Sequence, residues 1–297
     1  ELYYGETIFE RQIRILSSCG IDEFIITTGP YKEKLVDISK KYDNLKFTFV
    51  ENLQYKNTNY IVSMNNCYNL LDEEIILLHG DLVFNKNLIN KIMSNKNKSV
   101  CLYNEKKVLP QKDFKARFCN NVLKQVSISI FDKDCYAFQP LYKLSKEDVY
   151  AWKNKVKEFV ENGQVNVYAE NALNDITDEI SIIGMSYKDD YIDEIDNQED
   201  YNRVSNEIRY YDYREQSIEM TDSYIETLKK RINEKERIFI VCSKQFIDQI
   251  KNDLQKYNIT IFSKYSSNPK YEEIKEGIAL FKQKKCPKMP FKTPWNI

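Results

Sequence analysis

The chain has 297 residues, of which 42% are hydrophobic, and it carries 44 basic against 45 acidic side chains, for a net charge of −1. This length is enough for two domains or one large one. The balanced charge gives no electrostatic reason to expect a nucleic acid or an anionic membrane as a partner. The chain has one histidine, which nearly excludes Ser/His/Asp triads and His-rich metal sites. Any chemistry must therefore rest on carboxylates, on lysine and arginine, and on a metal ion.

Seven cysteines are scattered along the chain and are never spaced as CxxC. This pattern indicates reduced thiols rather than disulfides or a zinc site, and it predicts a cytoplasmic protein. No apolar run approaches the roughly 18 residues that a membrane-spanning helix needs. We therefore expect no membrane as a partner.

The first hundred residues alternate between expected helices and expected strands with short connections. Such alternation is typical of an α/β fold in which helices cover both faces of a mainly parallel sheet. In chain order, the elements are a helix at 7–18, a strand at 24–28, a helix at 31–42, a strand at 45–50, a helix at 60–70, a strand at 75–78, a helix at 87–93 and a strand at 99–103.

The strand at 75–78 is the one around which a site is most readily predicted. Its apolar run has no period-2 alternation, as in strands that are covered on both faces. Gly80 permits a tight turn, and Asp81 follows just past the carboxyl end of the strand, where open α/β sheets bind ligands. A carboxylate there is a candidate Mg²⁺ ligand, because this ion prefers oxygen donors. Asp81 could equally cap the next helix or stabilise the turn.

After Tyr103 the pattern changes to an antiparallel insertion, because strands at 114–118 and 122–130 flank the turn pair Asn120-Asn121. The later elements predict a first domain at 1–208, a linker at 209–220 and a second, partial β-α-β-α unit at 221–297. They are a short apolar strand at 135–138, helices at 146–162 and 168–176, strands at 180–185 and 191–196, a helix at 197–208, and then a helix at 224–232, a strand at 238–241, a helix at 244–257, a strand at 259–262 and a helix at 271–284.

A second acidic site lies at the end of the strand at 191–196. Period 2 places Glu194 and Asp196 on the same face of that strand. Two strand-end acids from distant parts of the chain, Asp81 and Asp196, can converge on one metal ion. The alternative is that these acids are ordinary surface charges in the acid-rich tract at 189–200.

Several motifs occur in a defined order over residues 1–206. They are Gly5-Glu6-Thr7, the strand ending at Gly29, Tyr55-Lys56-Asn57-Thr58-Asn59 before a helix that carries Ser63, Gly80-Asp81, Asp113-Phe114-Lys115-Ala116, Tyr168-Ala169-Glu170, and Glu194-Ile195-Asp196 with Asp200. Together they resemble the nucleotidyltransferases of the sugar-nucleotide pyrophosphorylase superfamily, and within it the phosphocholine and 2-aminoethylphosphonate cytidylyltransferases. The resemblance implies a GT-A-like Rossmann sheet, mostly parallel but mixed.

The resemblance also implies a reaction: Mg²⁺-dependent transfer of CMP from CTP to a small phosphate or phosphonate, by positioning and charge neutralisation, with release of pyrophosphate. It assigns Asp81 and Asp196 to Mg²⁺, Thr58, Asn59, Ser63 and Gly80 to the nucleotide, Tyr168, Glu170 and Glu194 to the acceptor, and Lys115 to a catalytic phosphate contact. A carboxylate with aromatic neighbours would suit an ammonium head group. Lys115 could equally be a solvated surface lysine, and Tyr168-Glu170 could be a helix N-terminus with a favourable acid.

The sequence departs from the nucleotidyltransferase pattern at its amino-terminal end. The family opens with a strand and a Gly-rich loop followed by Pro-Lys, which cradle the triphosphate. Residues 1–5 resemble the segment directly after that pair, so the resemblance predicts a chain truncated by about one β-loop unit.

Residues 221–297 resemble the N-terminal nucleotide-binding half of iron-containing alcohol dehydrogenases, but Cys286-Pro287-Lys288-Met289-Pro290 stands where that family has its Gly-rich turn.

Two other functions stay open at this point. One is a non-catalytic Rossmann-like module that senses a nucleotide or acts as a scaffold. The other is a fragment of a bifunctional cytidylyltransferase and alcohol dehydrogenase. The preferred nucleotide, the acceptor and the oligomeric state stay open too, with a homodimer as one option.

Overall fold

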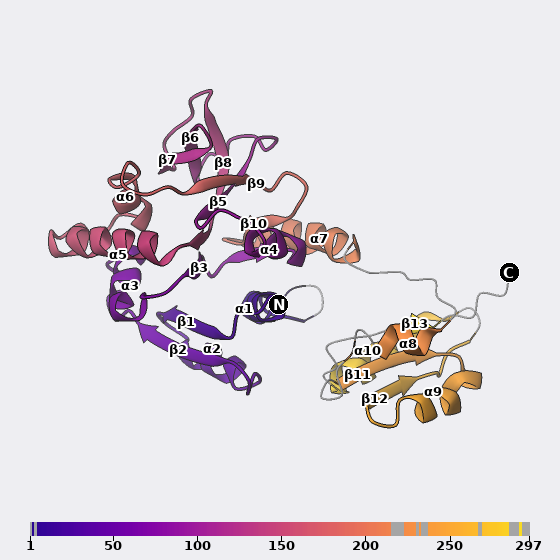
Figure 1. Cartoon of the computed structure of the whole chain (residues 1–297). Helices are drawn as coiled ribbons and strands as arrows, with labels where there is room; N and C mark the ends of the chain where they lie inside the picture. Colours follow the sequence, from indigo (N-terminus) through magenta and orange to yellow (C-terminus); the bar gives the residue numbers. More distant parts are fainter. Residues whose placement is uncertain are drawn as a thin grey trace. The chain divides into compact units, whose positions relative to one another are not determined.

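The computed structural model describes residues 2, 5–214, 223–229, 232, 237–266, 269–284 and 291–292. The chain divides into two compact units, Glu1–Ser217 and Ile218–Ile297, and each is described by itself (Figure 1). No helix in these ranges combines the length and the apolar character needed to cross a membrane.

The first unit alternates helices and strands up to residue 104 as the sequence predicts, except that an unpredicted short strand at Leu82–Phe84 directly follows the strand at Ile75–Leu78. Elsewhere in this unit the boundaries differ from the prediction by a few residues. Its elements are α1 (Ile8–Ser18), β1 (Glu23–Thr28), α2 (Lys32–Ser39), β2 (Lys46–Glu51), α3 (Tyr60–Asn66), the 3-10 turn η1 (Tyr68–Leu70), β3 (Ile75–Leu78), β4 (Leu82–Phe84), α4 (Lys86–Met93), β5 (Val100–Asn104), β6 (Lys115–Cys119), β7 (Val122–Ser127), β8 (Cys135–Leu144), α5 (Lys146–Glu161), α6 (Ala169–Asn174), β9 (Ile183–Ser186), β10 (Ile192–Glu194) and α7 (Gln198–Arg214).

The helix α7 is longer than the sequence predicts. It continues to Arg214, so the chain is still helical where a linker was expected from residue 209. Residues 215–220 of the expected linker lie outside the described residues.

The main sheet has six strands in the order β3-β8-β5-β9-β7-β6, and β8 also pairs with β6. Only β5 and β9 are parallel, whereas the other pairings are antiparallel. The expectation of a mostly parallel sheet is therefore wrong for these strands, although the mixed α/β class is confirmed. The hairpin predicted at Asn120-Asn121 is present, and both residues have positive φ angles of 49° and 64°.

The parallel prediction is wrong because of β8, of which the sequence pattern predicted only residues 135–138. Proline lacks the N–H that a central strand donates, so Pro140 argues against a continuous strand. In the structure the register between β5 and β8 shifts between Cys101 and Leu102, whose partners are Tyr142 and Gln139. Pro140 therefore lies in a β-bulge, which is where a sheet tolerates proline. The long strand separates β3 from β5 and reverses the pairing.

Four described strands of the first unit lie outside the main sheet. β1 and β2 form a parallel pair, and β4 and β10 form an antiparallel pair in which Glu194 lies opposite Leu82. Among the described strands, β1 pairs only with β2 and β3 only with β8. The expected single sheet is thus divided into three.

Helices cover both faces of β3. Ile75 and Leu77 pack against a cluster built on α3, α5 and α6, which lie together in Figure 1. Ile76 and Leu78 pack against a cluster that α1 and α4 share with β4. This arrangement confirms that the apolar run at 75–78 is covered on both sides.

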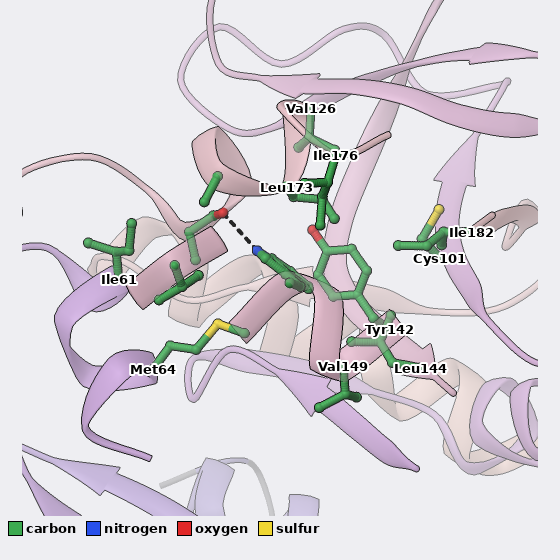
Figure 2. Packing of buried hydrophobic residues seen from close by; sticks show 14 of the residues in the cluster. Ile61, Met64, Cys101, Val126, Tyr142, Leu144, Val149, Leu173, Ile176 and Ile182 are labelled. Carbon is green, nitrogen blue, oxygen red and sulfur yellow. Dashed lines mark hydrogen bonds between the residues drawn. The ribbon is translucent and has the colours of Figure 1, made fainter. Parts of the chain in front are cut away.

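The cluster on α3, α5 and α6 surrounds two aromatic rings, Tyr142 and Trp152, whose centroids lie 5.2 Å apart in an edge-to-face arrangement. Trp152 is fully buried, and its Nε1 donates to the carbonyl oxygen of Ala169 at 2.9 Å, the contact drawn as a dashed line in Figure 2. This bond satisfies the polar atom of a buried tryptophan. It also fixes the first residue of α6 to the middle of α5.

The second unit contains a small parallel sheet in the order β12-β11-β13. The expected β-α-β-α succession is present in it, while residues 285–290, with the Cys286–Pro290 segment, lie outside the described residues. Its elements are α8 (Tyr224–Lys229), β11 (Arg237–Cys242), the 3-10 turn η2 (Lys244–Phe246), α9 (Ile247–Asp253), β12 (Asn258–Phe262), α10 (Tyr271–Lys284) and β13 (Phe291–Lys292).

Candidate functional site

Three acids from distant parts of the sequence meet at the carboxyl end of β3. Asp81 belongs to the three-residue turn between β3 and β4. Because β10 runs antiparallel to β4, Ile195 lies beside this turn, and its backbone N–H donates to the backbone oxygen of Asp81 at 3.2 Å. The structure thereby brings Asp81 together with Glu194 and Asp196, close enough for their charges to interact.

A fourth carboxylate, that of Asp113, completes the cluster. One ligand atom each of Asp113, Glu194 and Asp196 lies within 4.8 Å of the others. Asp113 has no role among the predicted site residues, and its only signal in the sequence is its place next to Phe114 in one of the family-like motifs. We call Asp81, Asp113, Glu194 and Asp196 the acidic cluster.

The acidic cluster is partly buried, and burial together with neighbouring carboxylates raises the pKa values of Asp81, Asp113 and Glu194. Burial is the largest cause, and the neighbouring carboxylates of Asp81 and Asp113 come next, in raising the pKa of Glu194 to about 8. Burial and Asp196 raise the pKa of Asp81, and burial and nearby acids raise that of Asp113. Gathering carboxylates in this way costs free energy unless a cation or a proton compensates.

Two basic side chains close to the acidic cluster are engaged in other contacts. Lys107 and Arg203 line a small cavity with Asp113, but both form ion pairs with Asp193, Lys107 at 3.1 Å. Meanwhile Oδ1 of Asp81 and Oε1 of Glu194 are buried without a hydrogen-bond partner. Buried polar atoms are normally satisfied. Unpaired carboxylate oxygens in an all-oxygen donor set therefore fit a hard divalent cation such as Mg²⁺.

Four aromatic rings lie next to the acidic cluster. His79 contacts Tyr60 and Phe114 with ring centroids at 4.7 and 6.3 Å. Tyr168 contacts the same two residues at 6.3 and 5.0 Å. Burial lowers the pKa of His79 to about 4, so the imidazole is neutral near pH 7. We call these four residues the aromatic cluster, and it adjoins the carboxylates because His79 is two residues from Asp81.

Glu170 stands behind the aromatic cluster rather than within it. Its side chain is 1% exposed, and its carboxyl group accepts from the hydroxyl of Tyr142 at 2.9 Å and from that of Tyr60. Burial raises its pKa to about 8. Glu170 therefore cannot make the predicted direct contact with an acceptor in this geometry, because Tyr60 lies between its carboxyl group and the aromatic cluster. The rings of Tyr60 and Tyr168 are the groups that can contact a ligand.

The predicted nucleotide contacts Thr58, Asn59 and Ser63 lie together at the start of α3. The buried Asn52, at the end of β2, donates from Nδ2 to Oγ1 of Thr58 at 3.3 Å and to Oγ of Ser63 at 3.1 Å. Asn59 caps α3 by accepting from the N–H of Tyr60 at 2.7 Å. Sequence reasoning missed Asn52, whose only signal is a polar residue directly after a strand.

Gly80, the remaining predicted nucleotide contact, is exposed beside Asp81. A Cβ atom built at Gly80 would have no atom within 4 Å. The turn is therefore open to a ligand at its backbone.

Lys115 differs from both of its predicted roles. It is fully buried, so it is not a solvated surface lysine. Its Nζ donates to the carbonyl oxygens of Pro110 at 2.8 Å and Ile128 at 2.6 Å, and it lies 4.1 Å from the ring centroid of Phe131. An ammonium held by two carbonyls and an aromatic face is compensated in its buried place, and it is not free to contact a phosphate.

The fold that presents these side chains is shared with nucleotidyltransferases. No protein-family model matches the chain. Among solved structures, CTP:phosphocholine cytidylyltransferase from Streptococcus pneumoniae is similar, with 19% sequence identity and a TM-score of 0.57 over 69% of this chain and 86% of that one. The inositol-1-phosphate CTP transferase from T. maritima is similar too, with 14% identity and a TM-score of 0.55 over 70% of this chain and 86% of that one.

At these identities the likeness establishes the fold, a mixed α/β fold of the nucleotidyltransferase kind. The likeness covers about two thirds of the chain. It gives no support to the predicted alcohol-dehydrogenase character of residues 221–297, which stays a prediction.

Proposed function

We propose that the chain is a Mg²⁺-dependent nucleotidyltransferase that transfers CMP from CTP to a small phosphate or phosphonate and releases pyrophosphate. The acidic cluster is the observation that carries this proposal. Asp113, Glu194 and Asp196 each offer a ligand atom within 4.8 Å of the others, Asp81 lies beside them, and Asp81 and Glu194 each have one buried oxygen without a hydrogen-bond partner. The fold is shared with two enzymes named for the use of CTP.

In this proposal Asp81 and Asp196 would hold the ion, with Asp113 and Glu194 beside them. When bound, Mg²⁺ supplies positive charge to the triphosphate and its leaving group. A phosphate or phosphonate oxygen of the acceptor attacks the α-phosphorus, and the bond to the pyrophosphate oxygen breaks. The chain contributes by placing the two substrates in line, since positioning and charge neutralisation are what such a transfer requires.

The nucleotide would approach the surface formed by the start of α3 and the β3–β4 turn. Thr58, Asn59 and Ser63 offer hydroxyl and amide groups there, and Asn52 holds Thr58 and Ser63 in place. Gly80 leaves its backbone open to a ligand because no side chain covers it. Lys115 has no part in this proposal, since its ammonium group is already bound.

The acceptor would place its head group against the aromatic cluster. Faces of tyrosine and phenylalanine rings attract cations, and the carboxyl group of Glu170 lies directly behind Tyr60. A small acceptor with an ammonium group, such as phosphocholine or 2-aminoethylphosphonate, matches this chemistry. The similar Streptococcus pneumoniae enzyme is named for phosphocholine.

The experiment is pyrophosphate release by the purified chain with each common nucleoside triphosphate, in the presence of Mg²⁺ and either phosphocholine or 2-aminoethylphosphonate. We expect release with CTP that depends on the acceptor and stops when EDTA is added. The exposed acid Asp178, which pairs with Lys124, offers a matched control: Asp178→Asn should retain the activity that Asp81→Asn loses. Nucleotide binding without release for any pair would favour the non-catalytic module instead.

A further inference from the structure

Gln12 on α1 contacts the turn that carries Asp81 from behind. Its Nε2 lies 2.9 Å from the carbonyl oxygen of Leu82, 3.2 Å from that of His79 and 3.3 Å from that of Gly80. The side chain is 8% exposed. The amide nitrogen of Gln12 thus faces three backbone carbonyl groups that lie just before and just after Asp81 in the chain. Its two hydrogens are shared among the three carbonyl oxygens.

This position on α1 would otherwise suit an apolar side chain. Its neighbours Ile13, Ile15 and Leu16 are buried in the cluster beneath β3 and β4. A buried amide is costly unless it is hydrogen-bonded, so packing alone would favour a residue such as methionine or leucine. The polar side chain is therefore explained by the carbonyls that it binds.

The helix that carries Gln12 is itself firmly placed. Thr7 and Glu10 form a capping box at its start. The next residue, Arg11, donates from Nε and Nη2 to the carbonyl oxygen of Phe84 at 3.0 and 2.9 Å, and it forms a bidentate pair with Asp212. Adjacent side chains of α1 therefore hold the backbone at both ends of β4.

We infer that Gln12 is a positioning residue that fixes the turn at residues 79–82 and thereby aims the carboxylate of Asp81 at the other three carboxylates of the acidic cluster. The role of Asp81 toward an ion rests on the proposed function, whereas the hold of Gln12 on the turn does not. Groups that orient a metal ligand without touching the metal typically change metal affinity by about 10- to 100-fold when they are replaced.

The first test measures binding of Mn²⁺ alone to the full chain by electron paramagnetic resonance, without nucleotide. Gln12→Met keeps the length of the side chain and removes the donor, and Gln12→Glu places a carboxylate against three carbonyl oxygens. We expect both variants to bind Mn²⁺ about 10- to 100-fold more weakly than the wild-type chain. Asp81→Asn identifies the site, since binding there should be lost.

A matched control separates positioning from stability. Ile13→Val disturbs the packing of the neighbouring buried residue of α1 and makes no contact with the turn carbonyls. It should lower the melting temperature but leave the affinity for Mn²⁺ unchanged. If Gln12→Met and Ile13→Val change affinity to the same extent, Gln12 only packs the helix and the inference is wrong.

The second test needs no metal ion. Amide hydrogen exchange at residues 79–82 in the metal-free chain should become faster in Gln12→Met and stay unchanged in Ile13→Val. Unchanged exchange in Gln12→Met would overturn the inference whatever the affinity. If the wild-type chain binds no Mn²⁺ at Asp81 while exchange still responds to Gln12→Met, the proposed function fails and the hold on the turn stands.

Discussion

The backbone N–H of Ile195 donates to the backbone oxygen of Asp81 at 3.2 Å. This bond extends the antiparallel pairing of β4 with β10 to the turn after β3, and the pairing places Glu194 and Asp196 beside Asp81. The chemistry proposed for the chain depends on this junction, since neither half of it could gather enough carboxylate oxygens for a divalent ion by itself.

Replacing Glu194 with glutamine should show that the acidic cluster serves activity at the expense of stability. The change removes one of several mutually repelling buried carboxylates, whose pKa is raised to about 8, so the melting temperature should stay the same or rise. Turnover should fall by about a hundredfold or more, because charge compensation by a bound ion is worth several kcal/mol. Pyrophosphate release and thermal unfolding of the same preparation check both parts; an active, less stable variant would contradict the assignment.

Glu170 should make stability depend on pH. Burial on folding raises its pKa from the ordinary value of 4.5 to about 8, so between these values the unfolded chain loses a proton that the folded chain keeps. The contribution is fully present below about pH 4.5 and is lost as pH rises through about 8. Relative to wild type, Glu170→Gln should therefore gain stability from pH 5 to pH 9, as measured by urea unfolding. Glu161→Gln, at an exposed acid of α5, should show no such trend.

Lys115 should matter for stability and not for phosphate binding. Lys115→Met removes the donor to two buried carbonyl groups, those of Pro110 and Ile128, and each unsatisfied group costs about 1–3 kcal/mol. The free energy of unfolding should fall accordingly, while KM for CTP stays within about twofold for the fraction that is folded. A tenfold or greater rise in KM for CTP with unchanged stability would instead support the phosphate contact that the family resemblance implies for Lys115.

Tyr168 should affect the acceptor and not the nucleotide. Its ring contacts Phe114 and Tyr60 in the aromatic cluster, and Tyr168→Leu removes one π face while retaining apolar bulk. Since a cation–π contact is worth about 0.5–2 kcal/mol, KM for an ammonium-bearing acceptor should rise about two- to thirtyfold. KM for CTP should be unchanged. Equal changes for an acceptor with and without a cationic head group would argue against cation recognition by the cluster.

Local patterns in the sequence were sufficient to predict most helices and strands and the hairpin at Asn120-Asn121. Positive φ angles at both asparagines follow from the type of turn that a two-residue hairpin requires. The same kind of reasoning placed Asp81 directly after a strand covered on both faces. These features depend on residues that are neighbours in the chain, so periodicity and turn chemistry reveal them.

Other features depended on contacts between distant segments. The ten-residue strand β8 contains Pro140, which in a sequence argues against a strand. Only the β-bulge against β5 shows how the sheet accommodates this proline. The family resemblance implied a phosphate contact for Lys115, with a solvated surface lysine as the alternative, and the sequence does not reveal that two carbonyl groups enclose its ammonium. Asp113 was assigned no role for the same reason.

The sequence by itself determined the order of the elements and the supply of acids from which a metal site could be built. Only the tertiary structure decided which acids converge, through the antiparallel pairing of β4 with β10. It alone placed Gln12 behind the turn of Asp81. The physical reason is that one-dimensional patterns report which face a residue presents, whereas hydrogen bonds between strands and from buried side chains decide what that face meets.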